Sequence, residues 1–259
     1  MKGWLIARQK RAMETVGEKE RLLAALRRTL EAYEGSVGHL SVFCVPVRMK
    51  DGKGFSAQLE RGRMNPEEVR ICLVFEKEDT FLVDGEPVVK PEAWGLPGGG
   101  VDIIDIKGDG TKEREISKSV KAEMLQELLD EIEVDGLIDV IRRVLHRETG
   151  EEAGLEVDPL WNYFRIDAKS SDETGRVNLV VTVLCDVASM SGKKDEVEIE
   201  MVSEFSPHEI VNHVKGADLV SGKPRWMYRG HGKRLGYILS LLGRDFEGVS
   251  TALRDCFGR

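Results

Sequence analysis

The chain has 259 residues, of which 41% are hydrophobic and 32% are charged, a composition typical of a globular protein with a sizeable core. Its 46 acidic and 38 basic side chains give a formal net charge of −8, which argues against general nucleic-acid binding because phosphate contacts need clustered Lys and Arg. No apolar run approaches a membrane span, and the first residues lack the apolar core of a signal peptide, so we expect a cytoplasmic protein without a membrane partner.

The first predicted element is an amphipathic helix at residues 17–34, whose leucines share one stripe and which the Gly35-Ser36 pair ends. We expect this helix to pack on the main domain or on a second subunit and to take no part in chemistry. The hydrophobic period then changes to that of strands. Residues 39–49 predict one strand, and residues 67–83 predict two strands joined by a turn at Glu78-Asp79.

The stretch AWGLPGGG follows at residues 93–100. Tryptophan, proline and three glycines in this order predict a strand that ends in a loop, whose backbone adopts unusual torsions or closely approaches another group. Residues 112–133 predict an amphipathic helix, which we expect to pack on the rest of the domain or on a second subunit. Its apolar stripe consists of Ile116, Val120, Met124, Leu128 and Ile132.

The rest of the chain alternates between helix and strand. A helix is predicted from about Leu137 to Ala153, with Gly154 as a natural C′ residue. A capping box formed by Ser206 and Glu209 opens a later helix. The other predicted elements are strands at residues 161–167, 176–187 and 196–205 and a last helix at residues 231–246, followed by a short tail.

This order of elements predicts an α/β fold in which helices cover one mixed sheet. We expect an N-terminal helical extension at residues 1–37, a main domain at residues 38–243 with a helical insertion at about 103–136, and a C-terminal tail at residues 244–259. The two amphipathic helices outside the core make a homodimer compatible with the sequence. The cysteines form no CxxC motif, and three of the four lie in apolar runs, so we expect buried thiols in a reducing compartment and no zinc site.

The end of the central helix carries three carboxylates on one face. Glu148, Glu151 and Glu152 stand at positions i, i+3 and i+4, where like charges repel, and the helix dipole disfavours anions at this end. Mg²⁺ prefers oxygen ligands and often bridges one or two carboxylates to substrate phosphates, so a bound dication would reverse this penalty. The alternative interpretation is a solvated helix surface with a weak Arg147–Glu151 pair.

The stretch RETGEEAGL at residues 147–155, together with WGLPGGG at residues 94–100, resembles the Nudix hydrolase family. The signature of that family is G-x5-E-x7-R-E-U-x-E-E-x-G-U, where U is a bulky apolar residue, and every fixed residue of its second half is present. The sequence departs from the signature in three ways. The region 103–136 lengthens the spacing, Asp139 stands where the first Glu is expected, and Thr149 stands at the first U position.

The resemblance implies an α/β/α sandwich with a mixed sheet over residues 38–243 and hydrolysis of a diphosphate bond in a nucleoside diphosphate linked to another moiety. It implies Mg²⁺, with Mn²⁺ as an alternative ion, and a metal-activated water that attacks phosphorus. It also implies that Arg147 orients the carboxylates, that Glu151 and Glu152 bind metal, and that Glu148 binds metal or acts as the base. A later carboxylate often joins such a site. Glu198 and Glu200 are candidates, which alternation on a water-exposed strand explains equally well.

The substrate is expected to be a small nucleotide-type molecule. Gly99 and Gly100 of the glycine motif are candidate substrate contacts, as are Trp161 and Phe164, for which strand packing is the alternative. The segment RGHGKRLGY at residues 229–237 is either a phosphate or ribose contact or an ordinary helix start. The alternative function is that of a Nudix-fold nucleotide-binding or regulatory protein with little or no catalysis.

Overall fold

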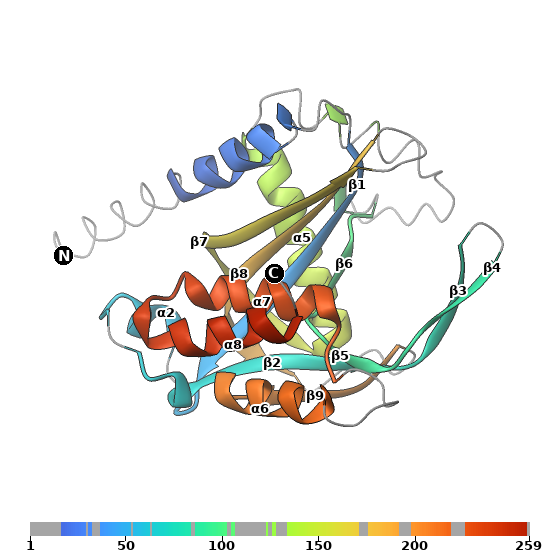
Figure 1. Ribbon diagram of the computed structural model, residues 1–259. Helices are drawn as coiled ribbons and strands as arrows, with labels where there is room; N and C mark the ends of the chain where they lie inside the picture. The colour runs from blue at the N-terminus through green and yellow to red at the C-terminus, as the bar shows by residue number, and fades with distance from the viewer. Residues whose placement is uncertain are drawn as a thin grey trace, which may run out of the picture. The chain divides into compact units, whose positions relative to one another are not determined.

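The computed structural model describes most of the chain, and its elements follow in the order shown in Figure 1. The described residues are 17–29, 31–32, 37–52, 54–62, 64–83, 86–102, 105–106, 123, 126–127, 134–170, 176–191, 198–218 and 226–257. The strands are β1 (Val37–Met49), β2 (Val69–Glu76), β3 (Asp79–Val83), β4 (Glu86–Lys90), β5 (Ala93–Gly95), β6 (Gly98–Gly100), β7 (Leu155–Ser170), β8 (Val177–Met190) and β9 (Ile199–Phe205). The helices are α2 (Phe55–Leu59), α5 (Val134–Ala153), α6 (Pro207–Asp218), α7 (Arg229–Ser240) and α8 (Glu247–Phe257), with 3-10 turns η1 (Pro66–Glu68) and η2 (Arg244–Phe246).

The chain folds into two compact units, and β1, β6, α5, β7 and β8 contribute residues to both. The first unit consists of residues 1–42, 99–145 and 160–183, and the second of residues 43–98, 146–159 and 184–259. The division of the chain at residues 37 and 243, which the sequence suggested, stays a prediction.

The hydrogen-bonded order of the main sheet is β5-β2-β1-β8-β7, with β6 paired to β1 and β9 paired to β2, while β3 and β4 form a separate two-stranded hairpin (Figure 1). The predicted α/β fold class is confirmed. In the second unit β2 runs antiparallel to β5 and β9, and Glu76 at its end lies opposite Ala93 and Ile199. This register sets the position of Glu76 next to β5 and β9.

Strand β2 forms the centre of the second unit because nearly every residue of the run VRICLV is apolar. Val69, Ile71, Leu73 and Val74 are at most 1% exposed, as expected for a strand that is covered on both faces. The predicted core thiols are confirmed, since Cys44, Cys72 and Cys185 are buried and none of the four cysteines forms a disulfide.

The predicted central helix is confirmed as α5, and its apolar stripe is buried. Ile138, Ile141 and Leu145 are at most 1% exposed. The helix ends at Gly154, whose φ of +62° lies in the left-handed region that favours glycine, as the C′ prediction requires. Thr149 is fully buried, and its hydroxyl donates to the Leu155 carbonyl oxygen at 3.3 Å. A polar residue therefore stands at the apolar signature position without leaving its hydroxyl unsatisfied.

The N-terminal helix is present over the described residues 17–29 and 31–32. Leu22 and Leu26 are fully buried, and Arg21 donates to the Asn162 side chain of β7 at 3.2 Å within the first unit. The helix thus packs on the chain itself. The predicted stripe from Ile116 to Ile132 lies outside the described residues. No described helix combines the length and apolar character that a membrane span needs.

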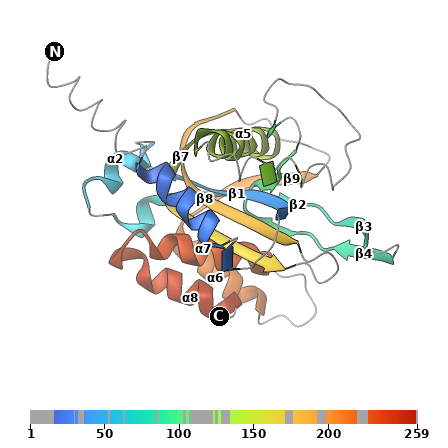
Figure 2. The same ribbon diagram turned by 90° about the horizontal axis from the view of Figure 1, so that it is seen from above.

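The capping box of α6 is confirmed, since Ser206 N–H donates to the Glu209 carboxylate at 2.6 Å and Glu209 N–H donates to the Ser206 hydroxyl at 3.2 Å. Helices α7 and α8 lie side by side in both ribbon views (Figure 2). Gly232 makes their contact possible, because a Cβ at this position would lie 2.0 Å from the Phe257 ring.

Three details differ from the sequence-based expectations. Asp79 begins β3 instead of belonging to a turn. The glycines 98–100 form β6 instead of a loop, because the backbone on either side bonds to β1 (Cys44 N–H to Pro97 O at 2.8 Å, Val101 N–H to Leu40 O at 2.9 Å). The last predicted helix stops earlier, at Ser240, and Gly243 with a φ of +102° separates it from α8, which the sequence analysis did not identify.

Candidate active site

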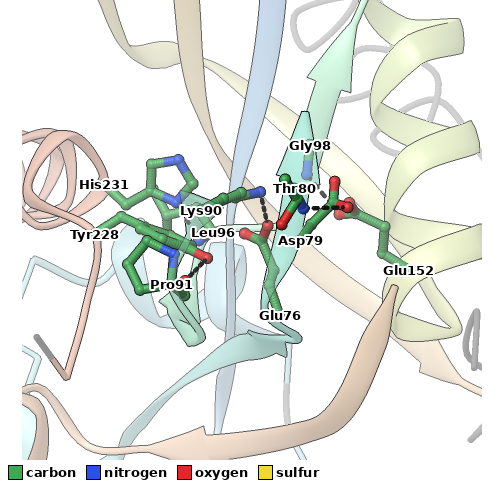
Figure 3. A network of polar contacts seen from close by, with 10 residues as sticks. All are labelled: Glu76, Asp79, Thr80, Lys90, Pro91, Leu96, Gly98, Glu152, Tyr228 and His231. Atoms are coloured by element: carbon green, nitrogen blue, oxygen red, sulfur yellow. Dashed lines mark hydrogen bonds and ion pairs between the residues drawn. The ribbon is translucent and has the colours of Figure 1, made fainter. Parts of the chain in front are cut away.

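Glu152 and Gly98 bring the two predicted motifs together in the second unit. The Gly98 N–H donates to a Glu152 carboxylate oxygen at 2.8 Å, although 54 positions separate the residues (Figure 3). The Gly98 φ of +148° lies where side chains are rarely tolerated, which explains a glycine at this point. The long insertion between the motifs therefore does not keep them apart.

Negative charge is concentrated around Glu152. The pKa of this carboxyl is raised from 4.5 to about 8, mainly by burial; the Gly98 hydrogen bond lowers the pKa, and the charges of Glu148, Glu76 and Glu198 raise it. Without a neighbouring cation, Glu152 is therefore protonated at neutral pH. A dication among these carboxylates would favour the ionised form.

Arg147 contacts two of the carboxylates that follow it in the motif. Its Nη1 lies 2.7 Å from Glu148 Oε1 and 3.8 Å from Glu151 Oε2. The Glu148 side chain is 13% exposed and the Glu151 side chain 64% exposed, so the shorter ion pair is also the better shielded one. Arg147 thus forms its closer ion pair with Glu148, and the solvated Arg147–Glu151 pair is the weaker contact.

Glu76, at the end of β2, is a member of this cluster that sequence analysis missed. Its carboxylate pairs with the Lys90 ammonium and is 15% exposed. Burial raises the pKa of Glu76 even though the hydrogen bond and charge of Lys90 lower it. In the sequence, Glu76 is one charged residue at the end of an apolar strand, and nothing in that pattern connects it to Glu152.

His231, from the segment 229–237, lies in the first turn of α7 and supports the glycine motif. Its Nδ1 accepts a hydrogen bond from the Leu96 N–H at 2.9 Å, and its ring packs 4.7 Å from the Phe43 ring. Burial lowers the pKa of His231 to about 3, with the charges of Arg234 and Lys90 acting in the same direction. The ring is therefore neutral and carries its proton on Nε2. Its role here is to position the backbone next to Pro97 and Gly98.

The remaining site candidates lie in the first unit. A Cβ on Gly100 would approach the His39 ring to 3.0 Å. Trp161 is 3% exposed, with the Arg142 guanidinium 6.0 Å from the centre of its ring, and Phe164 is half-buried. Gly99 belongs to the same unit. The burial of Trp161 is what strand packing requires.

Of the two proposed fourth carboxylates, Glu198 acts on Glu152, since its charge is among the causes that raise the Glu152 pKa. Glu200 is exposed on β9. Asp139, at the first signature position, forms a 2.8 Å ion pair with Arg142, and both side chains are well exposed.

The donor chemistry of the cluster fits a hard dication. Its groups are carboxylate oxygens, and one of them, on Glu152, is destabilised in its charged form by burial and by like charges. In the part of the chain that the structure describes, however, no three His, Cys, Asp or Glu side chains are gathered closely enough to enclose a metal ion.

No protein-family model and no curated protein matches the sequence. Among solved structures, the chain is similar to a NUDIX hydrolase from Nitrosomonas europaea (16% identity, 72% of this chain and 81% of the other, TM-score 0.35). It is also similar to a MutT NUDIX hydrolase from Burkholderia pseudomallei (16%, 77% and 96%, TM-score 0.35) and to an Ap4A hydrolase from C. elegans (14%, 70% and 89%, TM-score 0.33). Because these sequence identities and TM-scores are low, the similarity assigns no role to any individual residue of this chain.

Proposed function

We propose that the chain is a Nudix-type pyrophosphohydrolase, which cleaves a diphosphate bond in a nucleoside diphosphate linked to another moiety. The observation that carries the proposal is the hydrogen bond between Gly98 and Glu152, because it joins WGLPGGG to RETGEEAGL across the insertion. A chance acidic helix would have no reason to contact the glycine motif. The burial of Glu152 and the negative charges of Glu148, Glu76 and Glu198 around it add a physical reason for a cation at the same place.

The proposed metal ligands are Glu148, Glu151 and Glu152. Mg²⁺, or Mn²⁺ in its place, would neutralise phosphate charge and lower the pKa of a water molecule. The residues of the chain have separate tasks. Gly98 N–H holds the Glu152 carboxylate, and Arg147 holds Glu148, which would either bind the metal or accept the proton of the attacking water. The water oxygen forms a bond to phosphorus, and the bridging P–O bond breaks.

One observation favours the alternative of a nucleotide-binding or regulatory protein with little catalysis. The described carboxylates do not form a ready metal-binding group, and Glu148 is engaged by Arg147. A protein that has lost turnover could keep such an arrangement for ligand binding. The two functions differ in whether product is released.

Turnover decides between them. The purified protein is incubated with Mg²⁺ and, one at a time, nucleotide sugars, ADP-ribose, NADH, dinucleoside polyphosphates and nucleoside triphosphates, and the products are separated by chromatography. The enzyme proposal expects one class to be cleaved at the diphosphate, and Glu152→Gln to lower kcat by a factor of about 100 or more. Glu156→Gln is the matched control, since its carboxylate bonds to the exposed Ser189 hydroxyl at 2.9 Å. Equal rates for Glu152→Gln and the parent protein would show that the site is misplaced, and binding without cleavage of any class would favour the alternative.

A further inference from the structure

Lys90 and Glu76 form an ion pair in which the lysine side chain is more exposed to solvent than the glutamate side chain. The ammonium donates to Glu76 Oε2 (Figure 3). The Lys90 side chain is 41% exposed, whereas that of Glu76 is 15% exposed. An ammonium carries three N–H donors, and Glu76 accepts from one of them. The Glu76 carboxylate thus anchors a lysine whose side chain is partly open to solvent.

Strand pairing fixes the backbone positions of Lys90 and Glu76 within the second unit. Lys90 is the last residue of β4 and pairs with Asp79 on β3, and three residues later Ala93 pairs with Glu76 on β2. A Cβ on Gly95 would lie 2.5 Å from Glu76 Oε1, so the carboxylate rests directly against the β5 backbone. A bulkier residue at position 95 would displace it.

The pair lies between helix α7 and the carboxylate cluster. The charge of Glu76 raises the pKa of Tyr228 on one side and that of Glu152 on the other. The Lys90 ammonium stands 5.1 Å from the centre of the Tyr228 ring, in the range of a cation–π contact. The Tyr228 hydroxyl donates to the Pro91 carbonyl oxygen at 2.8 Å, which holds the ring in place next to the lysine. Figure 3 shows Lys90 and Glu76 between Tyr228 and Glu152.

A diphosphate substrate would bring several negative charges next to these carboxylates, so positive charge on the protein is needed in addition to the metal. Arg147 is occupied by Glu148 and Glu151. Lys90 has the remaining properties that are required, namely an ammonium held by Glu76 and Tyr228, a side chain that is 41% exposed, and a position beside the cluster.

We propose that Lys90 binds the diphosphate group of the substrate and that Glu76 is the positioning residue that keeps its ammonium aimed at that group. The inference rests on the proposed function, because it names the residue that recognises the substrate class given there. Lysine is a common phosphate ligand in proteins, and orientation by a partner carboxylate reduces the side-chain freedom that binding would otherwise remove.

The test combines kinetics on the best substrate with calorimetric binding of methylenediphosphonate, a non-hydrolysable diphosphate, in the presence of Mg²⁺. For Lys90→Gln we expect KM and the methylenediphosphonate Kd to rise about tenfold, with kcat changed much less. Lys90→Arg keeps the positive charge and should restore most of the affinity. Lys215→Gln, an exposed lysine in the last turn of α6, is the matched control and should behave like the parent protein.

A second variant separates binding from folding. Lys90→Gln leaves the buried Glu76 without its partner, so thermal unfolding is measured in parallel with the double variant Glu76→Gln/Lys90→Gln, which removes both charges. If the double variant unfolds at the parent temperature and still shows the tenfold loss, the loss belongs to substrate binding. If it binds methylenediphosphonate as tightly as the parent, the ion pair is structural and the inference is overturned.

The inference and the proposed function fail in different ways. If the parent protein neither binds methylenediphosphonate nor cleaves any diphosphate, the proposed function is refuted, and the role of Lys90 with it. If the parent binds and cleaves, and Lys90→Gln does so equally well, only the role of Lys90 is refuted.

Discussion

The carboxylate of Glu152 should make the metal-free protein less stable as the pH rises. The native pKa is about 8 against an ordinary value of 4.5, so between these pH values the native state holds a proton that the unfolded state has lost. When the unfolded state binds fewer protons, stability falls with rising pH. The loss therefore begins near pH 4.5 and is complete above about pH 8.

The magnitude follows from the same shift. One pKa unit corresponds to 1.36 kcal/mol, so a change from 4.5 to about 8 corresponds to a loss on the order of 5 kcal/mol. For a chain of this size that is a decrease in Tm of roughly 10–20 °C. Glu152→Gln removes the charge and keeps an oxygen that can accept the Gly98 hydrogen bond. We therefore expect the variant to exceed the parent in stability at pH 9 by up to that amount, and to match it closely at pH 5.

The assay is thermal unfolding in EDTA at several pH values from 5 to 9, with the difference in Tm between the variant and the parent as the readout. Taking the difference cancels groups that titrate equally in both proteins. Glu151→Gln serves as the control, because this carboxylate lies on the same helix but its side chain is 64% exposed. Mg²⁺ should stabilise the parent at pH 8 by about 2.7 kcal/mol at 100 times its Kd, and Glu152→Gln much less. A gap between Glu152→Gln and the parent that stays constant from pH 5 to 9 would refute the reasoning about burial and repulsion.

Three further predictions concern other parts of the second unit. Gly232→Ala should lower the free energy of unfolding by about 1–3 kcal/mol, because its Cβ would overlap the Phe257 ring. Gly248→Ala on α8 meets no atom within 4 Å and should raise the free energy of unfolding by up to about 1 kcal/mol. Urea titration measures both changes, and equal effects of the two variants would contradict the packing argument. Arg147→Lys keeps the charge but loses the planar guanidinium, so kcat should fall about tenfold or more with little change in Tm, and an unchanged kcat would show that the ion pair is dispensable. The pKa of His231 is lowered to about 3 in the folded protein, whereas in the unfolded state the ring takes up a proton near pH 6.5. The free energy of unfolding should therefore fall as the pH drops below 6.5. An NMR titration in which the folded-state ring changes protonation between pH 5 and 8 would rule this out.

The sequence predicts best where a local pattern alone determines the structure. The stripe of α5, the C′ glycine Gly154 and the capping box of Ser206 with Glu209 each depend on residues within a few positions, and all are confirmed. Strand β6 was not predicted, because its pairing depends on backbone groups of β1 that are distant in the sequence, whereas three consecutive glycines by themselves are typical of a loop. Within the site, the contact of Arg147 with Glu148 follows from their adjacency on one helix. Glu76 could not be found in the same way, because its neighbours come from three other stretches of the chain.

The hydrogen bond between Gly98 and Glu152 also has a consequence for protein engineering. It closes a loop of more than fifty positions, and the entropy cost of closing a loop grows only with the logarithm of its length, by about 0.6 kcal/mol for each doubling. The length of the chain between the motifs therefore adds little to the entropy cost of bringing Gly98 and Glu152 together. The interval is instead constrained by its contacts in the first unit, where Asp105 is 2% exposed and its carbonyl oxygen accepts from Arg143, and where Gln126 accepts from the Val37 N–H at 2.9 Å. An engineered change of length should keep these contacts intact.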